Sequence, residues 1–109
     1  MTSIPNENFR NIWIGIAHVQ PKPDNHILDG AMGAYVVAVG RANDLNGFSQ
    51  KLVELLESYG LYVLEIEDVE PFSHRIMHHD VHNEILRLAN ALSDEAPILL
   101  DQFECYMDE

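Results

Sequence analysis

The chain has little that would support a disulfide framework, a membrane span or a secretory leader. Its 109 residues include one cysteine, Cys105, which has no partner for an internal disulfide. The longest nearly apolar run, residues 31–40, is about half of the ~20 residues that a membrane-spanning helix needs. The first residues lack the basic stretch and apolar segment that mark a signal peptide. These absences predict a reducing, cytoplasmic environment.

The sequence also contains few basic residues. Six Lys and Arg stand against eighteen Asp and Glu, giving a formal net charge of −12. Residues 1–51 are balanced, whereas residues 52–109 hold two arginines against fourteen carboxylates and so carry the whole surplus. Such a surface repels nucleic acid and anionic membranes and attracts basic proteins. The charge therefore predicts a basic protein partner, and neither a nucleic-acid ligand nor a membrane.

Motifs for nucleotide binding and catalysis are missing as well. The glycines match neither the dinucleotide-binding fingerprint nor the phosphate loop. Cys105 falls in a predicted strand, where a buried, inert thiol is expected. Glu65 and Glu67, two positions apart on an exposed strand face, would both ionise and would not work as an acid–base pair. The sequence therefore predicts a protein that is not an enzyme and has no cofactor.

Hydrophobic periodicity predicts a single domain over residues 1–109, because its length suits one core and no linker divides it. Strands are expected at 12–19, 34–41, 61–70 and 98–106, and helices at 45–59 and 73–92. In the first strand, Ile12, Ile14 and Ile16 face one way and Trp13, Ala17 and Val19 the other. In the third, Tyr62, Leu64 and Ile66 should oppose Val63, Glu65 and Glu67.

The ends of the helices carry recognisable signals. Asn43 or Asp44 can cap the first helix, and Gly60 can end it in a left-handed conformation. The second helix begins at Ser73 or is capped by Asp80, and it presents Met77 within an apolar line that continues to Leu92.

This order, ββαβαβ, favours an α+β fold. We expect a two-layer α/β sandwich in which a mixed sheet of about four strands carries two helices on one face. The first two strands pair antiparallel, and their edge leaves room for a homodimer. The other face of the sheet is left available.

Four histidines lie within nine residues, at His74, His78, His79 and His82. A spacing of four on one helix lets two imidazoles share a zinc or nickel ion. Two ligands do not complete a tetrahedron, the zincin glutamate is replaced by His79, and nothing selects Asp80 or Glu84 as a further ligand. We therefore expect no metal site, and histidines that cap, pack and contact carboxylates.

The segment EIEDVEPF is the most distinctive acidic patch. It has two interpretations: a solvated strand edge whose charges prevent edge-to-edge aggregation, or a docking face for a basic protein. Docking would also need exposed aromatic side chains to supply binding energy. The residues predicted to contact a partner are Glu65, Glu67, Asp68, Glu70 and Phe72.

The chain resembles the small, acidic α/β immunity proteins of bacterial toxin systems, including the contact-dependent growth-inhibition type. The resemblance rests on size, on the acidic surplus and on the pattern GAYVVAVGRAND…FSQKLVELLESYGLYVLEIEDVEPF, and it covers residues 34–92. It implies an inhibitor that binds a cognate basic toxin, often a nuclease, and it assigns no individual residue a role. The alternative is a small acidic regulatory or adaptor domain in which the charge serves solubility.

Overall fold

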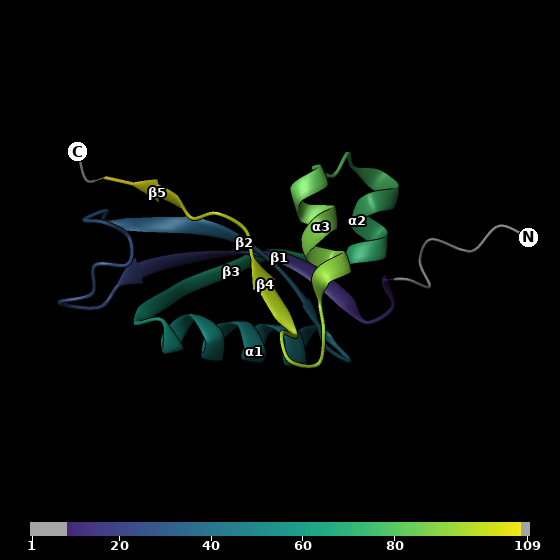
Figure 1. Cartoon of the computed structure of the whole chain (residues 1–109), viewed down its shortest axis with the longest axis horizontal. Helices are drawn as coiled ribbons and strands as arrows, with labels where there is room; N and C mark the ends of the chain where they lie inside the picture. The colour runs from purple at the N-terminus through teal and green to yellow at the C-terminus, as the bar shows by residue number, and fades with distance from the viewer. Residues whose placement is uncertain (1–8, 108–109) are drawn as a thin grey trace, which may run out of the picture.

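An antiparallel sheet forms the centre of the molecule. The computed structural model describes residues 9–107, which form five strands and three helices (Figure 1). In chain order these are β1 (Ile12–Pro21), β2 (Gly33–Arg41), α1 (Leu45–Ser58), β3 (Leu61–Pro71), α2 (Phe72–His78), α3 (Asn83–Ala91), β4 (Ile98–Leu100) and β5 (Glu104–Tyr106). The predicted α+β class is confirmed, with one more strand and one more helix than expected.

The strand order is β3-β1-β2-β4, and β5 pairs with β2 as well. Strands β1 and β2 pair antiparallel as predicted, but every other pairing is antiparallel too, so the expected mixed sheet is wrong. The β2–α1–β3 connection still makes its two strands run in the same direction. Because β1 lies between them, they never form a parallel hydrogen-bonded pair.

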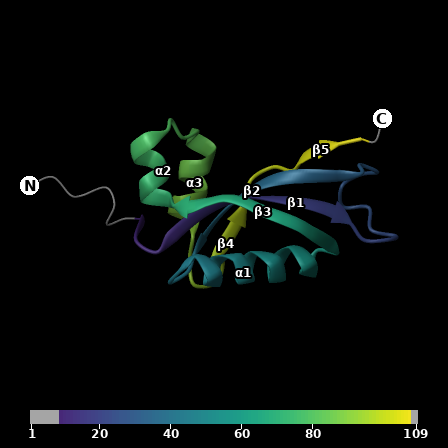
Figure 2. The ribbon, with the colours of Figure 1, turned by 180° about the vertical axis from the view of Figure 1, so that it is seen from behind.

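Helix α1 covers one face of the sheet, and α2 and α3 cover part of the other (Figures 1 and 2). The prediction that both helices pack on one face is therefore wrong. On the α1 face, Phe48 is fully buried, and an added Cβ at Gly15 or Gly40 would lie 3.3 or 3.2 Å from its ring. The two glycines thus leave the space that lets this ring pack directly on β1 and β2.

The second hydrophobic cluster lies under α2 and α3. Isoleucines from the start of β1 pack there against Phe72 and against the inner side of α3. Its buried members are Ile12, Ile14, Val39, Phe72, Ile85, Ala89 and Leu92. Because the cluster reaches only to Ile14 on β1, the helices cover one end of this face.

The ends of α1 follow the predicted signals. Asp44 is the N-cap, and its Oδ1 accepts a hydrogen bond of 2.7 Å from the backbone N–H of Gly47. After the helix, Gly60 has φ = 80°, in the left-handed region where a side chain is disfavoured. The capping alternative is thereby resolved in favour of Asp44 over Asn43.

The predicted helix over residues 73–92 is wrong in its continuity, because it is two helices joined by a short link. His79 and His82 both have extended backbones and flank the link. Apolar residues recur at spacings of three and four across it, so periodicity alone could not reveal the break. Met77 is 66% exposed, and Ile76 packs on the second cluster instead.

Two irregularities in β3 change which side chains share a face. The pairing of β3 with β1 shifts between Val63 and Glu65 and again between Glu67 and Glu70. Each shift adds a residue that has no partner on β1, as in a β-bulge. Val63 and Ile66 therefore both pack on the α1 side, whereas strict alternation had placed them on opposite faces.

The C-terminal prediction of one strand at 98–106 is also corrected, since β4 and β5 are separate short strands on β2. Cys105 is exposed in β5 and not buried as expected. Strands β1 and β2 are both internal, so the edge expected for a homodimer does not lie on them. The long outer edge belongs to β3, whose bulges and carboxylates oppose strand pairing.

Candidate functional site

The part of the second sheet face that α2 and α3 leave uncovered carries a row of polar and aromatic side chains. In the register of the sheet, Glu65 on β3 lies opposite His18 on β1, and His18 lies opposite Tyr35 on β2. Tyr35 in turn lies opposite Glu104 on β5. Directly paired residues of antiparallel strands project to the same face, so the four side chains form one cross-strand row. We call it the Glu65–Glu104 row.

The centre of the row is an aromatic stack. The rings of His18 and Tyr35 are nearly parallel, at 13°, with centroids 4.4 Å apart. Tyr106 extends the stack, with its centroid 5.6 Å from His18, and its hydroxyl oxygen lies 2.7 Å from His18 Nε2 in a hydrogen bond. Tyr35 nevertheless remains 41% exposed, so the stack offers aromatic surface to solvent.

Gly33 makes this position of Tyr106 possible. A Cβ at Gly33 would overlap the phenol of Tyr106 and would lie 2.7 Å from the carbonyl oxygen of Val19. Without that Cβ, the Tyr106 side chain can lie over the strand and reach His18. The stack therefore depends on a glycine at the beginning of β2.

The acidic residues predicted on β3 separate into two groups. Glu65, Glu67 and Asp68 are exposed, and no ion pair involves any of them within residues 9–107. Glu67 lies opposite Ile16, next to the Glu65–Glu104 row and on the same face. Asp68 adopts φ = 56° at the bulge, a left-handed conformation that Asp tolerates better than most residues.

Glu70 belongs to the second group because it is bound within the molecule. Its Oε1 accepts a hydrogen bond of 2.6 Å from His74 Nδ1, and its Oε2 accepts one from Arg75 Nε. The His74 hydrogen bond, followed by that of Arg75, lowers the pKa of the Glu70 carboxyl below 4.5. Glu70 is thereby locally neutralised, and we leave it out of the partner-binding set.

Phe72 lies in the core. Its side chain is 0% exposed and makes an edge-on contact with Phe9, with centroids 4.9 Å apart. A side chain without exposed surface cannot contact a partner, so we also leave Phe72 out. The aromatic surface near the acids comes from Tyr35 and Tyr106.

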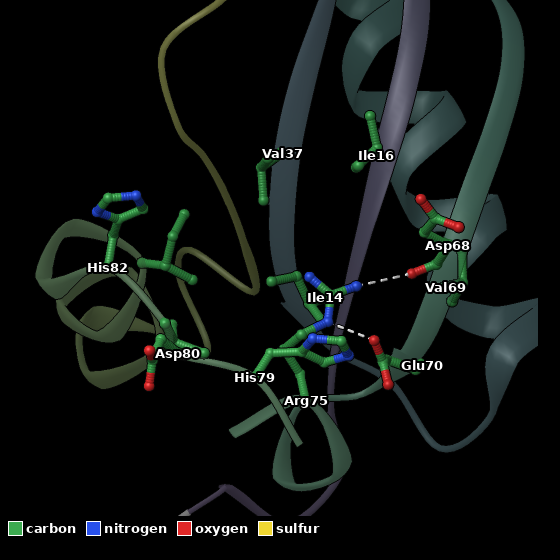
Figure 3. Close-up of a pocket in the computed structure, with 12 residues that line it drawn as sticks. Ile14, Ile16, Val37, Asp68, Val69, Glu70, Arg75, His79, Asp80 and His82 are labelled. Atoms are coloured by element: carbon green, nitrogen blue, oxygen red, sulfur yellow. Dashed lines mark hydrogen bonds and ion pairs between the residues drawn. The ribbon is translucent and has the colours of Figure 1, made fainter. Parts of the chain in front are cut away.

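Between the row and the helices lies a cleft of about 700 Å³ (Figure 3). Ile16 and Val37 line its sheet side, and Arg75 extends across its base to hydrogen-bond Glu70 and, at 3.1 Å, the Asp68 carbonyl oxygen. His82 projects from the opposite side, away from Arg75 (Figure 3). The cleft thus continues the row as a hollow with aliphatic side chains on its sheet side and polar side chains, including Arg75 and His82, around the rest.

The four clustered histidines are divided between elements. His74 and His78 lie on α2 with ring centroids 4.4 Å apart, whereas His79 and His82 flank the link to α3. Within the part of the chain that the structure describes, no group of three or more His, Cys, Asp or Glu could hold a metal ion. The expected contact with a carboxylate is present, between His74 and Glu70.

Sequence reasoning missed His18, Tyr35 and Glu104. Tyr35 lies inside the nearly apolar run of residues 31–40, and Glu104 lies in a segment with no clear alternation. The available signal was Tyr35 itself, because its polar hydroxyl within an otherwise apolar run could mark the exposed face of the strand. Its neighbours across the strands depend on a register that the sequence does not state.

Comparison of this chain with protein-family models, with curated proteins and with solved structures finds no match. None of the helices within residues 9–107 is long and apolar enough to cross a membrane.

Proposed function

We propose that the protein binds a basic partner protein through the Glu65–Glu104 row and the adjoining Glu67, and that the partner is a toxin domain that binding neutralises. The observation that carries the proposal is the combination, on one sheet face, of an exposed tyrosine with carboxylates that form no ion pair within residues 9–107. Glu65 and Glu104 flank the stack in register, and Tyr35 is 41% exposed between them.

The physical roles of the two kinds of side chain differ. Tyrosine supplies a large contact area and a hydrogen-bonding hydroxyl, and it is among the residues enriched in binding hot spots. Carboxylates speed the approach of a cationic partner and fix its orientation. An open antiparallel face holds both kinds on a rigid support, which reduces the entropy lost on binding.

Two exposed methionines lie next to the paired ends of β2 and β5, where the Tyr106 end of the aromatic stack is located. Met32 is 46% exposed and Met107 65% exposed, and the backbone N–H of Met32 donates to the Tyr106 carbonyl oxygen at 3.0 Å. Methionine is enriched at protein interfaces because its flexible side chain adapts to a partner. The candidate surface itself combines aromatic and acidic groups, and adaptable methionines lie at its margin.

A second candidate function is a small acidic domain whose charge serves solubility. This function is favoured because the excess of negatively charged residues is spread over several elements. Glu54 and Glu57 are exposed on α1, on the opposite side of the sheet, and Asp94 and Glu95 are exposed in the α3–β4 connection. Charge distributed in this way also keeps a protein soluble without any partner.

Charge reversal at the row separates the two candidates. The experiment isolates a basic protein that co-purifies stoichiometrically from the native host and measures its affinity for purified variants. We expect Glu65→Lys/Glu67→Lys to weaken binding at least tenfold, and the matched control Glu54→Lys/Glu57→Lys to change it less than threefold. Equal effects of the two pairs would support the solubility function instead.

Neutralisation needs its own readout. Expression of the co-purified partner should arrest growth, and co-expression of the wild-type protein should restore it. The Glu65→Lys/Glu67→Lys variant should fail to restore growth although it accumulates to wild-type levels. A partner that is harmless when expressed alone would contradict the toxin assignment.

A further inference from the structure

We infer that the Tyr35–Glu104 half of the row is a binding site for an arginine side chain of the partner. This inference rests on the proposed function and names the chemical group that the row would recognise. The chemical class follows from an aromatic residue that is 41% exposed and has a carboxylate beside it in register.

The exposed ring is the first requirement. One side of Tyr35 is stacked on His18 at a centroid distance of 4.4 Å, which holds the ring in place. Since the residue is still 41% exposed, part of the ring remains accessible to an incoming group. A cation over a tyrosine face is attracted by the negative potential of the ring.

The same sheet face already contains one such contact. Lys22 Nζ lies 5.5 Å from the ring centroid of Tyr62. Tyr62 shares the face of Glu65 and Glu67, through its pairing with Gln20. Within residues 9–107, no Lys or Arg makes such a cation–π contact with Tyr35. Of the two rings, Tyr35 is therefore the one that a cation of the partner can occupy.

The flanking carboxylate distinguishes arginine from lysine. Glu104 lies directly opposite Tyr35, at the strand separation of about 5 Å. A planar guanidinium can stack on a ring while its N–H groups donate to a carboxylate beside that ring, whereas an ammonium is a compact, strongly hydrated point charge. Adjacent ring and acid therefore favour arginine over lysine.

Other occupants fit less well. Nucleic acid would be repelled by Glu65, Glu67 and Glu104, which are exposed on the same face. A second copy of this chain would bring the same carboxylates to the interface and would add a formal charge of −12. A basic protein is the macromolecule whose charge is complementary.

The test compares two peptides of equal charge, hexa-arginine and hexa-lysine, in NMR titrations of the full chain at low ionic strength. We expect hexa-arginine to bind at least threefold more tightly and to shift the signals of Tyr35 and Tyr106. Tyr35→Leu should remove the preference while leaving hexa-lysine binding within twofold. Tyr35→Phe should retain the preference, because it keeps the aromatic face.

A matched control and a second variant guard against loss of folding. Tyr59 is 45% exposed at the end of α1, so Tyr59→Leu should leave the arginine preference unchanged. Glu104→Gln removes the charge without removing the ring, and it should reduce the preference at least twofold. Retention of the preference in both Tyr35→Leu and Glu104→Gln would overturn the site.

The outcomes separate this inference from the proposed function. If both peptides bind equally and Glu65→Lys/Glu67→Lys weakens both, the arginine site is overturned while an acidic docking face stands. If hexa-arginine binds selectively but the native partner binds Tyr35→Leu as tightly as wild type, the site exists and the partner does not use it, which overturns its assignment to the partner.

Discussion

Glu70 shows how a residue that looks like part of an acidic surface can instead stabilise the fold. Its carboxylate joins β3 to α2 through His74 and Arg75, and these hydrogen bonds lower its pKa. A group whose pKa is lower in the folded state stabilises the protein fully above its unfolded pKa. That stability is lost as the pH falls through the lowered value.

We therefore predict that Glu70→Gln lowers the free energy of unfolding by about 1–2 kcal/mol at neutral pH, because a charge-assisted pair is lost. The difference from wild type should shrink as the pH falls below 4.5. Urea unfolding at a series of pH values from about 3 to about 7 measures both effects. Glu65→Gln is the control, because Glu65 lies on the same strand and forms no ion pair in the described part of the chain, residues 9–107. An equal loss in both variants would contradict the prediction.

Gly33 supports the aromatic stack by the absence of a side chain. We predict that Gly33→Ala lowers the free energy of unfolding by about 1–3 kcal/mol, since the added Cβ would meet both the Tyr106 ring and the Val19 carbonyl oxygen. NMR should show the Tyr106 ring displaced from His18. Cys105→Ala, at an exposed position of β5, should leave stability unchanged, and an undisturbed Tyr106 in Gly33→Ala would contradict this account.

At the level of elements, α1 gives the cleanest test of local sequence signals. Asp44 accepts the capping hydrogen bond from Gly47, whereas Asn43 is an exposed neighbour. Asp44→Ala should lower the free energy of unfolding by about 1 kcal/mol because a helix N–H loses its acceptor. Asn43→Ala should change it by less than half as much, as measured by thermal and urea unfolding, and the reverse order would assign the cap to Asn43.

Local signals predicted the α+β class, the ends of α1 and the two faces of β1. They failed where packing between distant elements decides the outcome. The bulge between Val63 and Glu65 puts Val63 and Ile66 on the same face, and alternation cannot show an inserted residue. Predicting the site also required knowledge of how distant strands pair. Charge alone identified Glu65 and Glu67, whereas His18 and Glu104 join them only through the strand register.

The charge of the whole molecule has a different role from the charge of the row. The surplus extends over several elements, including α1 and the α3–β4 connection, so the net charge of −12 does not by itself define a face. It nevertheless attracts a cationic partner from any direction, and the row then fixes the orientation. Long-range attraction and local recognition should therefore respond differently to salt.

We predict that the association rate of the native partner falls at least tenfold between about 10 mM and about 300 mM salt, since screening shortens the Debye length. Stopped-flow mixing measures this rate. Tyr35→Leu should leave the association rate nearly unchanged and raise the dissociation rate, because it removes a short-range contact. An association rate independent of salt would contradict electrostatic steering.

The location of the contact is the central claim, and cross-saturation NMR in the complex with the native partner tests it most directly. Saturation transferred from the partner should reach the methyl groups of Ile16 and Val37, which lie on the same sheet face as the row. It should not reach Leu45, which is 45% exposed on α1. Transfer to Leu45 without transfer to Ile16 and Val37 would place the partner on the opposite side of the sheet and contradict the account.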